Sequence, residues 1–218
     1  MLVVGGSSGL GFRLASVLSS ENKVIITGRK DPEKKELEFL RLDLTARSLP
    51  ESLDGLVSKL PDIDLLIYAA GSYARGLLPL MHDQRIREMH TVYLLAPTLL
   101  MSRILWKQRR LPGFIAISSI SQSRPNAFEP VYCSLKAGFG MFANCLSLDP
   151  NIGKVLVASP ARINGSGKGS AWQGEQGQLD PDWVTATILS EYEDDFGYKL
   201  VEITRNPATV TVKELRKN

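Results

Sequence analysis

The sequence predicts a single doubly wound α/β domain, a parallel sheet with helices on both of its faces. Short apolar runs alternate along the chain with stretches whose apolar residues recur at helical spacing. Most of the apolar runs do not alternate with polar residues, which is typical of strands buried on both faces. With 218 residues and 44% hydrophobic content, the chain is long enough for one well-buried domain and short for two. We therefore expect one domain over residues 1–218.

Seven apolar runs are the predicted strands, and five stretches between them are the predicted helices. The strands are expected at residues 2–4, 24–27, 39–42, 65–69, 114–117, 155–158 and 200–203. The helices are expected at residues 10–20, 49–60, 83–107, 130–148 and 181–190. Because strands and helices alternate, the pattern predicts a parallel seven-stranded sheet.

One stretch follows neither pattern. Residues 164–180 read NGSGKGSAWQGEQGQLD, with five glycines and Trp172 as the main apolar anchor. A long segment of this kind in a compact domain is usually functional or disordered. We interpret it as a mobile lid, and a plain disordered insertion is the alternative.

Composition argues against several classes of partner. The net charge of +3 is spread along the chain in short basic clusters, so nucleic acid is not expected as the partner. No apolar run approaches the roughly 20 residues of a membrane span, and a signal-peptide pattern is missing. A soluble, cytoplasmic protein without membrane contact is expected.

The cysteines and histidines give no sign of a disulfide or a metal site. Cys133 and Cys145 fall in one predicted helix, twelve residues apart, a rise of about 18 Å that no disulfide can bridge. His82 and His90 lack ligand partners at usable spacing, so no metal is expected.

A glycine-rich turn follows the first predicted strand. Residues 3–11 read VVGGSSGLG, and a predicted amphipathic helix comes next. Gly5 permits a tight turn, while Gly9 and Gly11 let the backbone approach a pair of phosphates and let the helix pack on the strand. Free N–H groups at the start of the helix face the phosphates. In this context the turn predicts a dinucleotide site.

Tyr132 and Lys136 are spaced to share one face of a predicted helix. A free phenol has a pKa of about 10, and a unit charge about 4 Å away at an effective dielectric near 20 is worth about 4 kcal/mol, or roughly three pKa units. The pair therefore predicts a Tyr132 pKa near neutrality, suited to a general acid. One such pair arises easily by chance, so an ordinary core tyrosine is the alternative.

These features together resemble the short-chain dehydrogenase/reductase family. The motifs occur in the family's order over nearly the whole chain: GGSSGLG, TGR, LDLT, YAAG, ISSIS, YCSLK and SPARI. Ser119 stands thirteen residues before Tyr132, at the family's distance. The resemblance implies a Rossmann-like fold, a nicotinamide cofactor and a reaction that interconverts a carbonyl and an alcohol. It also implies a small-molecule substrate and a homodimer or homotetramer.

The resemblance assigns roles to three catalytic residues. Ser119 would hold and polarise the substrate carbonyl, and Tyr132 would give its proton to the forming alkoxide. Lys136 would bind the nicotinamide ribose and lower the pKa of the tyrosine.

The resemblance also implies a cofactor site. Asp43 would meet the adenine amino group, Leu44 would line the adenine pocket, and Ala70 and Gly71 would pass beneath the adenosine ribose. The full expected set is Gly5, Ser7, Ser8, Gly9, Leu10, Gly11, Arg29, Asp43, Leu44, Ala70, Gly71, Tyr132, Lys136, Pro160 and Ile163.

The residues after the second predicted strand favour NADP(H) over NAD(H). An acidic residue there would accept from the ribose 2′-OH and repel a 2′-phosphate. This chain has Gly28, Arg29 and Lys30 instead. A guanidinium can clamp a phosphate with two hydrogen bonds. The alternative is that Arg29 is a solvated surface residue.

The chain departs from the family pattern at three places. Tyr93 stands where the family has an asparagine that holds a relay water behind the lysine; its hydroxyl either replaces the amide or its ring fills the relay. YAAG replaces Asn-Asn-Ala-Gly, and Ala161 replaces a glycine. A second function therefore stays open, a catalytically weak or inactive NADP(H)-binding sensor or scaffold.

The substrate itself lies beyond the sequence. Its pocket is expected from Ser119, Tyr73, Arg75, Phe128 and the lid with Trp172. Arg75 would either bind an acid group or be solvated.

Overall fold

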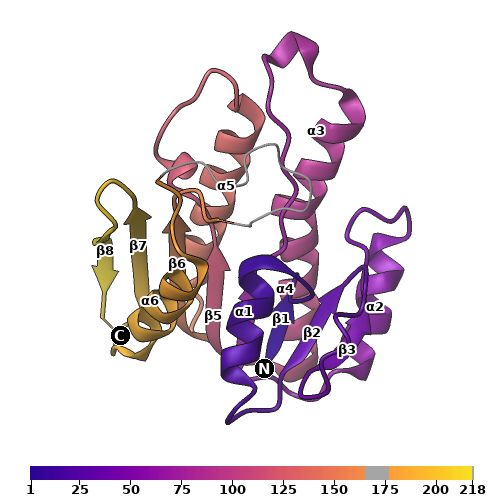
Figure 1. Ribbon diagram of the computed structural model, residues 1–218. Coiled ribbons are helices and arrows are strands. Elements are labelled where there is room, and N and C mark those ends of the chain that lie inside the picture. Colours follow the sequence, from indigo (N-terminus) through magenta and orange to yellow (C-terminus); the bar gives the residue numbers. More distant parts are fainter. Residues whose placement is uncertain (165–176, 218) are drawn as a thin grey trace.

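The computed structural model describes residues 1–164 and 177–217, which form one sheet with helices on both faces (Figure 1). The sheet has eight strands in the order β3-β2-β1-β4-β5-β6-β7-β8. Seven of them pair in parallel. The strands are β1 (Leu2–Val4), β2 (Ile25–Gly28), β3 (Glu38–Arg41), β4 (Leu65–Tyr68), β5 (Leu111–Ile117), β6 (Ile152–Pro160), β7 (Tyr198–Thr204) and β8 (Thr209–Arg216). The predicted doubly wound α/β class is confirmed.

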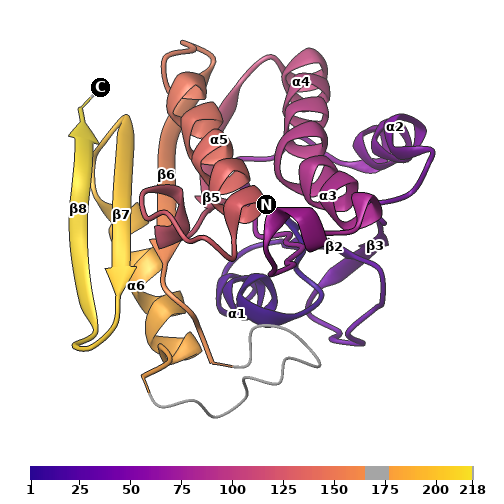
Figure 2. The same ribbon diagram turned by 90° about the horizontal axis from the view of Figure 1, so that it is seen from above.

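The strand count differs from the predicted seven, because β8 adds an antiparallel edge to β7. Residues 209–216 read TVTVKELR and are mostly exposed, since β8 lies beyond the helices that cover the central strands (Figure 2). Among its apolar side chains, Val210 packs on the core as a partly buried residue. The strand therefore lacks the continuous apolar run by which the other seven were found.

Six α-helices cover the two faces of the sheet within the described ranges. They are α1 (Gly9–Leu18), α2 (Leu49–Lys59), α3 (Asp83–His90), α4 (Ala96–Gln108), α5 (Pro130–Leu146) and α6 (Pro181–Glu193). Figure 2 shows α1 and α6 on one side of the sheet and α2, α4 and α5 on the other. None of these helices combines the length and apolar character needed to span a bilayer.

The strand side chains divide between two cores with a period of two. In β1, Val3 faces the core under α1 and α6, while Leu2 and Val4 face the core under α2, α4 and α5. Both cores are made of fully buried aliphatic and aromatic residues. This two-sided burial explains why the central strands read as unbroken apolar runs.

The helix predicted at residues 83–107 is interrupted. It consists of α3, the π-turn η2 (Thr91–Leu95) and α4. Pro97, in the first turn of α4, has no N–H with which to continue the hydrogen bonds of η2, which runs directly into this helix. A π-turn inside a helix is frequent at functional sites.

Candidate active site

The carboxyl ends of four central strands gather the expected site residues at one edge of the sheet. β1 leads into Gly5, β4 into Ala70, β5 into Ser119, and β6 ends at Pro160. The strand order reverses between β1 and β4, where the chain leaves the sheet in opposite directions. In open α/β sheets, ligands bind at such a switch point.

Gly5 brings two turns into close approach. Its φ is +80°, and a Cβ placed on it would lie 2.6 Å from the backbone nitrogen and Cα of Ala70. A Cβ on Gly11 would lie 2.4 Å from the carbonyl oxygen of Gly5. Both glycines are therefore required for the turn after β1 to fit under α1 and against the turn after β4.

The start of α1 is open and suited to an anion. Ser8 precedes the helix without a side-chain cap hydrogen bond, and no acidic residue occupies the first turn. Gly9 has a φ of +59°, and a Cβ there would meet nothing within 4 Å. Exposed N–H groups with space in front of them fit the diphosphate of a dinucleotide.

The end of β2 meets the same glycine-rich turn. A Cβ on Gly28 would lie 2.0 Å from Ser7 Oγ, so Ser7 packs directly against the residue that precedes Arg29. Arg29 is exposed. Two of the expected cofactor residues, Ser7 and Arg29, thus lie at one end of the site.

Asp43 is held by its own turn. Its Oδ1 accepts hydrogen bonds from the N–H of Thr45 at 2.9 Å and from Thr45 Oγ1 at 2.7 Å. These hydrogen bonds, with smaller contributions from Arg29 and Arg41, hold the pKa of Asp43 below its usual range. The carboxylate is therefore fixed and charged. Leu44 beside it is buried in the core under α2.

The remaining expected cofactor residues lie on neighbouring elements. Leu10 is partly buried and packs on the core under α1 and α6. Gly71 follows β4, and a Cβ there would lie 3.2 Å from Tyr93 Oη. Ile163, just beyond Pro160, is buried and bridges to Leu179.

Ser119 and Tyr132 face each other across the gap between β5 and α5. Ser119 Oγ accepts from the N–H of Ser121 at 3.2 Å, which orients it at the start of the short 3-10 turn η3 (Ile120–Gln122). Tyr132 lies in the first turn of α5, and its phenol interacts with the Ser119 hydroxyl. The structure therefore brings the expected carbonyl-binding hydroxyl to the expected acid.

Lys136 lies one turn further along α5 and is buried. Its ammonium donates to the carbonyl of Ile117, at the end of β5, at 2.9 Å. Its Nζ is 4.3 Å from the ring centroid of Tyr93 and 5.8 Å from that of Tyr132. Lys136 thus faces Tyr132 as the spacing predicts, but a backbone carbonyl and the ring of Tyr93 are its nearer partners.

The pKa values differ from the sequence expectation. Burial raises the pKa of Tyr132 to about 12, although the hydroxyls of Ser119 and Tyr93 act to lower it. Burial lowers the pKa of Lys136 to about 7. The predicted near-neutral pKa of Tyr132 is therefore wrong for this structure. Desolvation disfavours the charged form of both residues and is the largest cause of both shifts.

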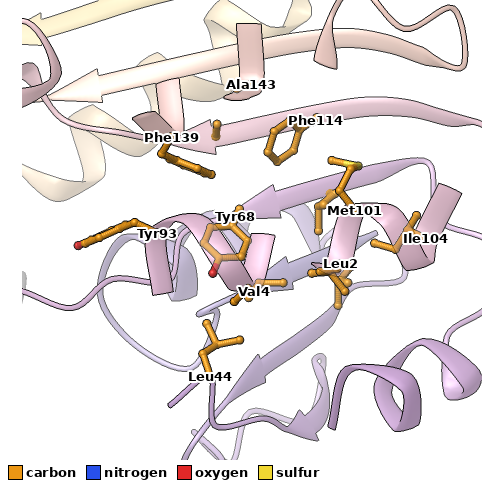
Figure 3. Close-up of a cluster of buried hydrophobic side chains, with 14 of the residues drawn as sticks. Leu2, Val4, Leu44, Tyr68, Tyr93, Met101, Ile104, Phe114, Phe139 and Ala143 are labelled. Atoms are coloured by element: carbon orange, nitrogen blue, oxygen red, sulfur yellow. The ribbon is translucent and has the colours of Figure 1, made fainter. Parts of the chain in front are cut away.

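Tyr93 lies between the core and the active site. It belongs to η2 and is 3% exposed. Figure 3 shows it at the end of the core cluster, near Tyr68 and Phe139, with its hydroxyl directed away from the packed side chains. That hydroxyl accepts from the N–H of Ser72 at 3.1 Å. The ring packs edge-on against Tyr132, with centroids 5.8 Å apart.

The residues expected around the substrate connect the loop after β4 with the loop before α5. Tyr73 packs edge-on against Tyr132, with ring centroids 5.1 Å apart, and its hydroxyl donates to Glu129 Oε1 at 2.6 Å. The guanidinium of Arg75 lies 5.2 Å from the ring centroid of Phe128. The N–H of Gly76 donates to the carbonyl of Phe128 at 2.8 Å.

Sequence analysis missed Glu129. Glu129 directly precedes Pro130, which begins α5. From the sequence, this position predicts a residue at the start of a helix, and nothing in it predicts a hydrogen bond with Tyr73. Most of the predicted lid, including Trp172, lies outside the described residues. Within residues 1–164 and 177–217, no three His, Cys, Asp or Glu side chains gather where they could hold a metal ion. Cys133 and Cys145 both lie in α5, as expected, and are free thiols.

Comparison with known proteins points to one family. A family model described as short chain dehydrogenase matches residues 1–164. The 3-oxoacyl-[acyl-carrier-protein] reductase FabG of Rickettsia prowazekii (strain Madrid E) is 30% identical over 156 residues, which cover 68% of this chain. The match spans 65% of that relative's own length.

Solved structures share the fold over almost the full chain. An alcohol dehydrogenase from Thermococcus sibiricus, complexed with 5-hydroxy-NADP, matches with a TM-score of 0.80 at 18% identity and covers 95% of this chain and 96% of that one. Serine dehydrogenase from Escherichia coli matches with a TM-score of 0.77 at 20% identity and covers 96% of each chain. With the family model matched over the glycine-rich turn, Ser119, Tyr132 and Lys136, the chain belongs to the short-chain dehydrogenase/reductase family of oxidoreductases.

Proposed function

We propose that the protein is an NADP(H)-dependent oxidoreductase that interconverts a carbonyl and an alcohol, with Tyr132 as its acid and base. The observation that carries the proposal is that Ser119, Tyr132 and Lys136 lie together after the carboxyl end of β5, at the same edge of the sheet as the open start of α1. A phenol, a hydroxyl and a cation around one small space suit proton transfer to an oxygen that gains negative charge.

In the proposed reduction, the hydroxyls of Ser119 and Tyr132 hydrogen-bond the substrate carbonyl oxygen. When bound, the nicotinamide supplies the hydride to the carbonyl carbon. Tyr132 gives its proton to the oxygen as negative charge develops there. Lys136 stabilises the resulting phenolate through its positive charge. In the oxidation direction the phenolate accepts the alcohol proton.

Arg29 supports NADP(H) as the cofactor form. Arg29 is exposed and directly follows Gly28, the residue that packs against Ser7, and a 2′-phosphate would lie at this end of β2. The fixed carboxylate of Asp43 and the backbone at Ala70 and Gly71 would hold the adenosine. Two of the similar structures are described as complexes with 5-hydroxy-NADP and with NADP+. The reductase name of the Rickettsia relative favours a carbonyl as the physiological substrate.

A substitution of the phenol tests the proposal. Tyr132→Phe removes the proton donor and leaves the ring, so we expect NADPH oxidation over a panel of aldehydes and ketones to fall by at least about 100-fold. NADPH binding, measured by fluorescence titration, should stay nearly unchanged. Normal turnover by this variant would refute the role of Tyr132.

A second function is favoured by one observation. The raised pKa of Tyr132 and the lowered pKa of Lys136 mean that the site stabilises neither the phenolate of Tyr132 nor the ammonium of Lys136. Such a protein could bind NADP(H) as a sensor or scaffold with little or no turnover. Tight NADPH binding without oxidation on any carbonyl tested would favour this function over the first.

A further inference from the structure

Tyr93 contacts three parts of the active site at once. Its hydroxyl accepts from the N–H of Ser72, in the turn after β4. Its ring face covers the ammonium of Lys136 at 4.3 Å, and its ring edge meets Tyr132. The two phenol groups also interact directly. One side chain therefore contacts both ionisable residues of the proposed reaction.

A hydrogen bond from β4 supports the turn that carries Tyr93. Tyr68, fully buried, donates from its hydroxyl to the carbonyl of Val92 at 2.5 Å. Val92 and Tyr93 are the two buried residues of the π-turn η2. A carbonyl left without its regular helical partner at a π-turn thus finds a buried donor. This hydrogen bond anchors the turn that presents Tyr93.

We propose that Tyr93 is a positioning residue for this reaction: its hydroxyl donates a hydrogen bond to the phenolate of Tyr132, and its ring holds the ammonium of Lys136. The inference rests on the proposed function. In the reduction, the O–H bond of Tyr132 breaks, the proton moves to the substrate oxygen, and the electron pair stays on the Tyr132 oxygen. Tyr93 keeps its own proton throughout.

Two features make the Tyr93 hydroxyl a suitable donor. The N–H of Ser72 donates to its oxygen, and a hydroxyl that accepts one hydrogen bond donates the next more strongly. Its own pKa is raised well above the ordinary value, chiefly by burial, so it stays protonated when Tyr132 ionises.

The charges around Tyr132 show why a neutral donor matters. Lys136 is the nearby cation, but burial lowers its pKa to about 7, and its Nζ already donates to Ile117. The groups that face Tyr132 from the packed elements are Ser119 after β5, Tyr73 after β4, Tyr93 in η2, and Glu129, Cys133 and Lys136 of α5 and its cap. Glu129 and Cys133 raise the pKa of Tyr132, whereas Ser119 and Tyr93 lower it. Removal of the Tyr93 hydroxyl should therefore raise that pKa further.

The experiment is the pH dependence of both reaction directions in Tyr93→Phe. Oxidation needs the phenolate, so its rate rises with pH through the pKa of Tyr132. Loss of one hydrogen bond to a charged oxygen should shift this rise upward by about one to two pH units. Oxidation at pH 8 should fall about 10-fold or more, and reduction should fall less. NADPH binding should be unchanged, because the ring over Lys136 remains.

The matched control is Tyr68→Phe, which removes the buried hydroxyl of β4 that donates to Val92 in η2 and leaves the Tyr93 hydroxyl in place. It should shift the pH profile much less than Tyr93→Phe does, because the buried ring of Tyr68 still packs behind the turn and the Tyr93 hydroxyl is kept. An unshifted profile in Tyr93→Phe would overturn the inference. An equal shift in Tyr68→Phe would also overturn it, because the effect would then come from the turn and not from the Tyr93 hydroxyl.

A measurement that needs no substrate turnover tests the contact between Tyr93 and Tyr132 independently of the proposed function. Tyrosine labelled with ¹³C at Cζ gives one signal per phenol, and the Tyr132 signal is the one lost in Tyr132→Phe. Burial raises the pKa of Tyr132 to about 12, so this phenol is protonated at pH 8 in every variant, and a moved signal there reports loss of the contact with the Tyr93 hydroxyl and not a change of ionisation. We expect the signal to move in Tyr93→Phe and to move much less in Tyr68→Phe. If the wild-type protein turns over no substrate, the proposed function fails, while a moved signal still supports the contact and an unmoved one overturns it.

Discussion

At the residue scale, Tyr132 and Lys136 show what a spacing determines and what it leaves open. Four residues of helix place both side chains toward one site. The depth of that site then decides their protonation. Lys136 is 4% exposed, and its nearest partners are a backbone carbonyl and an aromatic ring, neither of which carries a negative charge. Burial of the charged form of Lys136 therefore costs free energy that these neutral partners only partly offset.

The stability of the protein should therefore change with pH through Lys136. Its pKa is lowered to about 7 in the folded chain from 10.5. Between these values the unfolded chain binds the extra proton, so the free energy of unfolding rises with pH. It should rise by about 2–3 kcal/mol from pH 7 to pH 9.

The control is Lys136→Met, which keeps the side-chain volume and removes the titration. Urea unfolding at pH 7 and pH 9 measures both proteins. The variant should lack most of the rise, and the same rise in both would show that Lys136 does not cause it. Above pH 10 both should lose stability, because burial raises the pKa of Tyr132 and the unfolded chain releases that proton first.

At the element scale, the two-sided burial of the central strands made most of the fold predictable. β1, β4 and β5 read as apolar runs because helices cover both of their faces. β8 was missed because an edge strand with exposed residues has no such run. The π-turn η2 was missed because its residues keep a helical spacing, and the hydrogen bond from Tyr68 that anchors it joins residues far apart in sequence.

The candidate site was predictable to a similar degree and for similar reasons. Its residues come directly after strands or in the first turns of helices, where a motif marks both the element and the position. Glu129 and the role of Tyr93 depend on contacts between loops and helices distant in sequence. Protonation depends on burial, which no local pattern shows.

The turn between β2 and the following loop carries a prediction about the cofactor. Arg29→Ala should weaken NADPH binding about 10-fold to 100-fold, because a charge-assisted hydrogen bond to the 2′-phosphate is lost. NADH binding should be unchanged. Fluorescence titration with both nucleotides measures the ratio of NADPH affinity to NADH affinity.

Lys30→Ala is the matched control, since Lys30 is the next residue and is also an exposed cation. It should change the ratio of NADPH to NADH affinity much less. Equal weakening of both nucleotides in Arg29→Ala would show a general charge effect, and Arg29 would then not discriminate between the two cofactors.

At the scale of the whole molecule, the two faces of the sheet are covered differently. Exposed apolar side chains lie on α4 and α5 at Trp106 and Met141, and next to these helices at Leu95 in η2 and Leu148 after α5. Two glycines of α5 allow close packing within this chain: a Cβ on Gly138 would lie 3.2 Å from Leu94, and one on Gly140 would lie 2.3 Å from Gln122. The exposed side chains, and not these glycines, favour the homo-oligomer that the family resemblance implies.

An oligomer built on this face should be sensitive to one charge. Met141 is 60% exposed, so Met141→Glu leaves the fold of one chain intact. At an interface, the carboxylate would lose its hydration without a partner, which strongly disfavours association. Light scattering after size exclusion should show a multiple of 24.0 kDa for the wild type and a lower mass for the variant. Val17→Glu, at a comparably exposed apolar residue of α1 on the other face, should leave the mass unchanged. A wild-type mass of one chain, or an equal loss in both variants, would show that α4 and α5 do not form the interface.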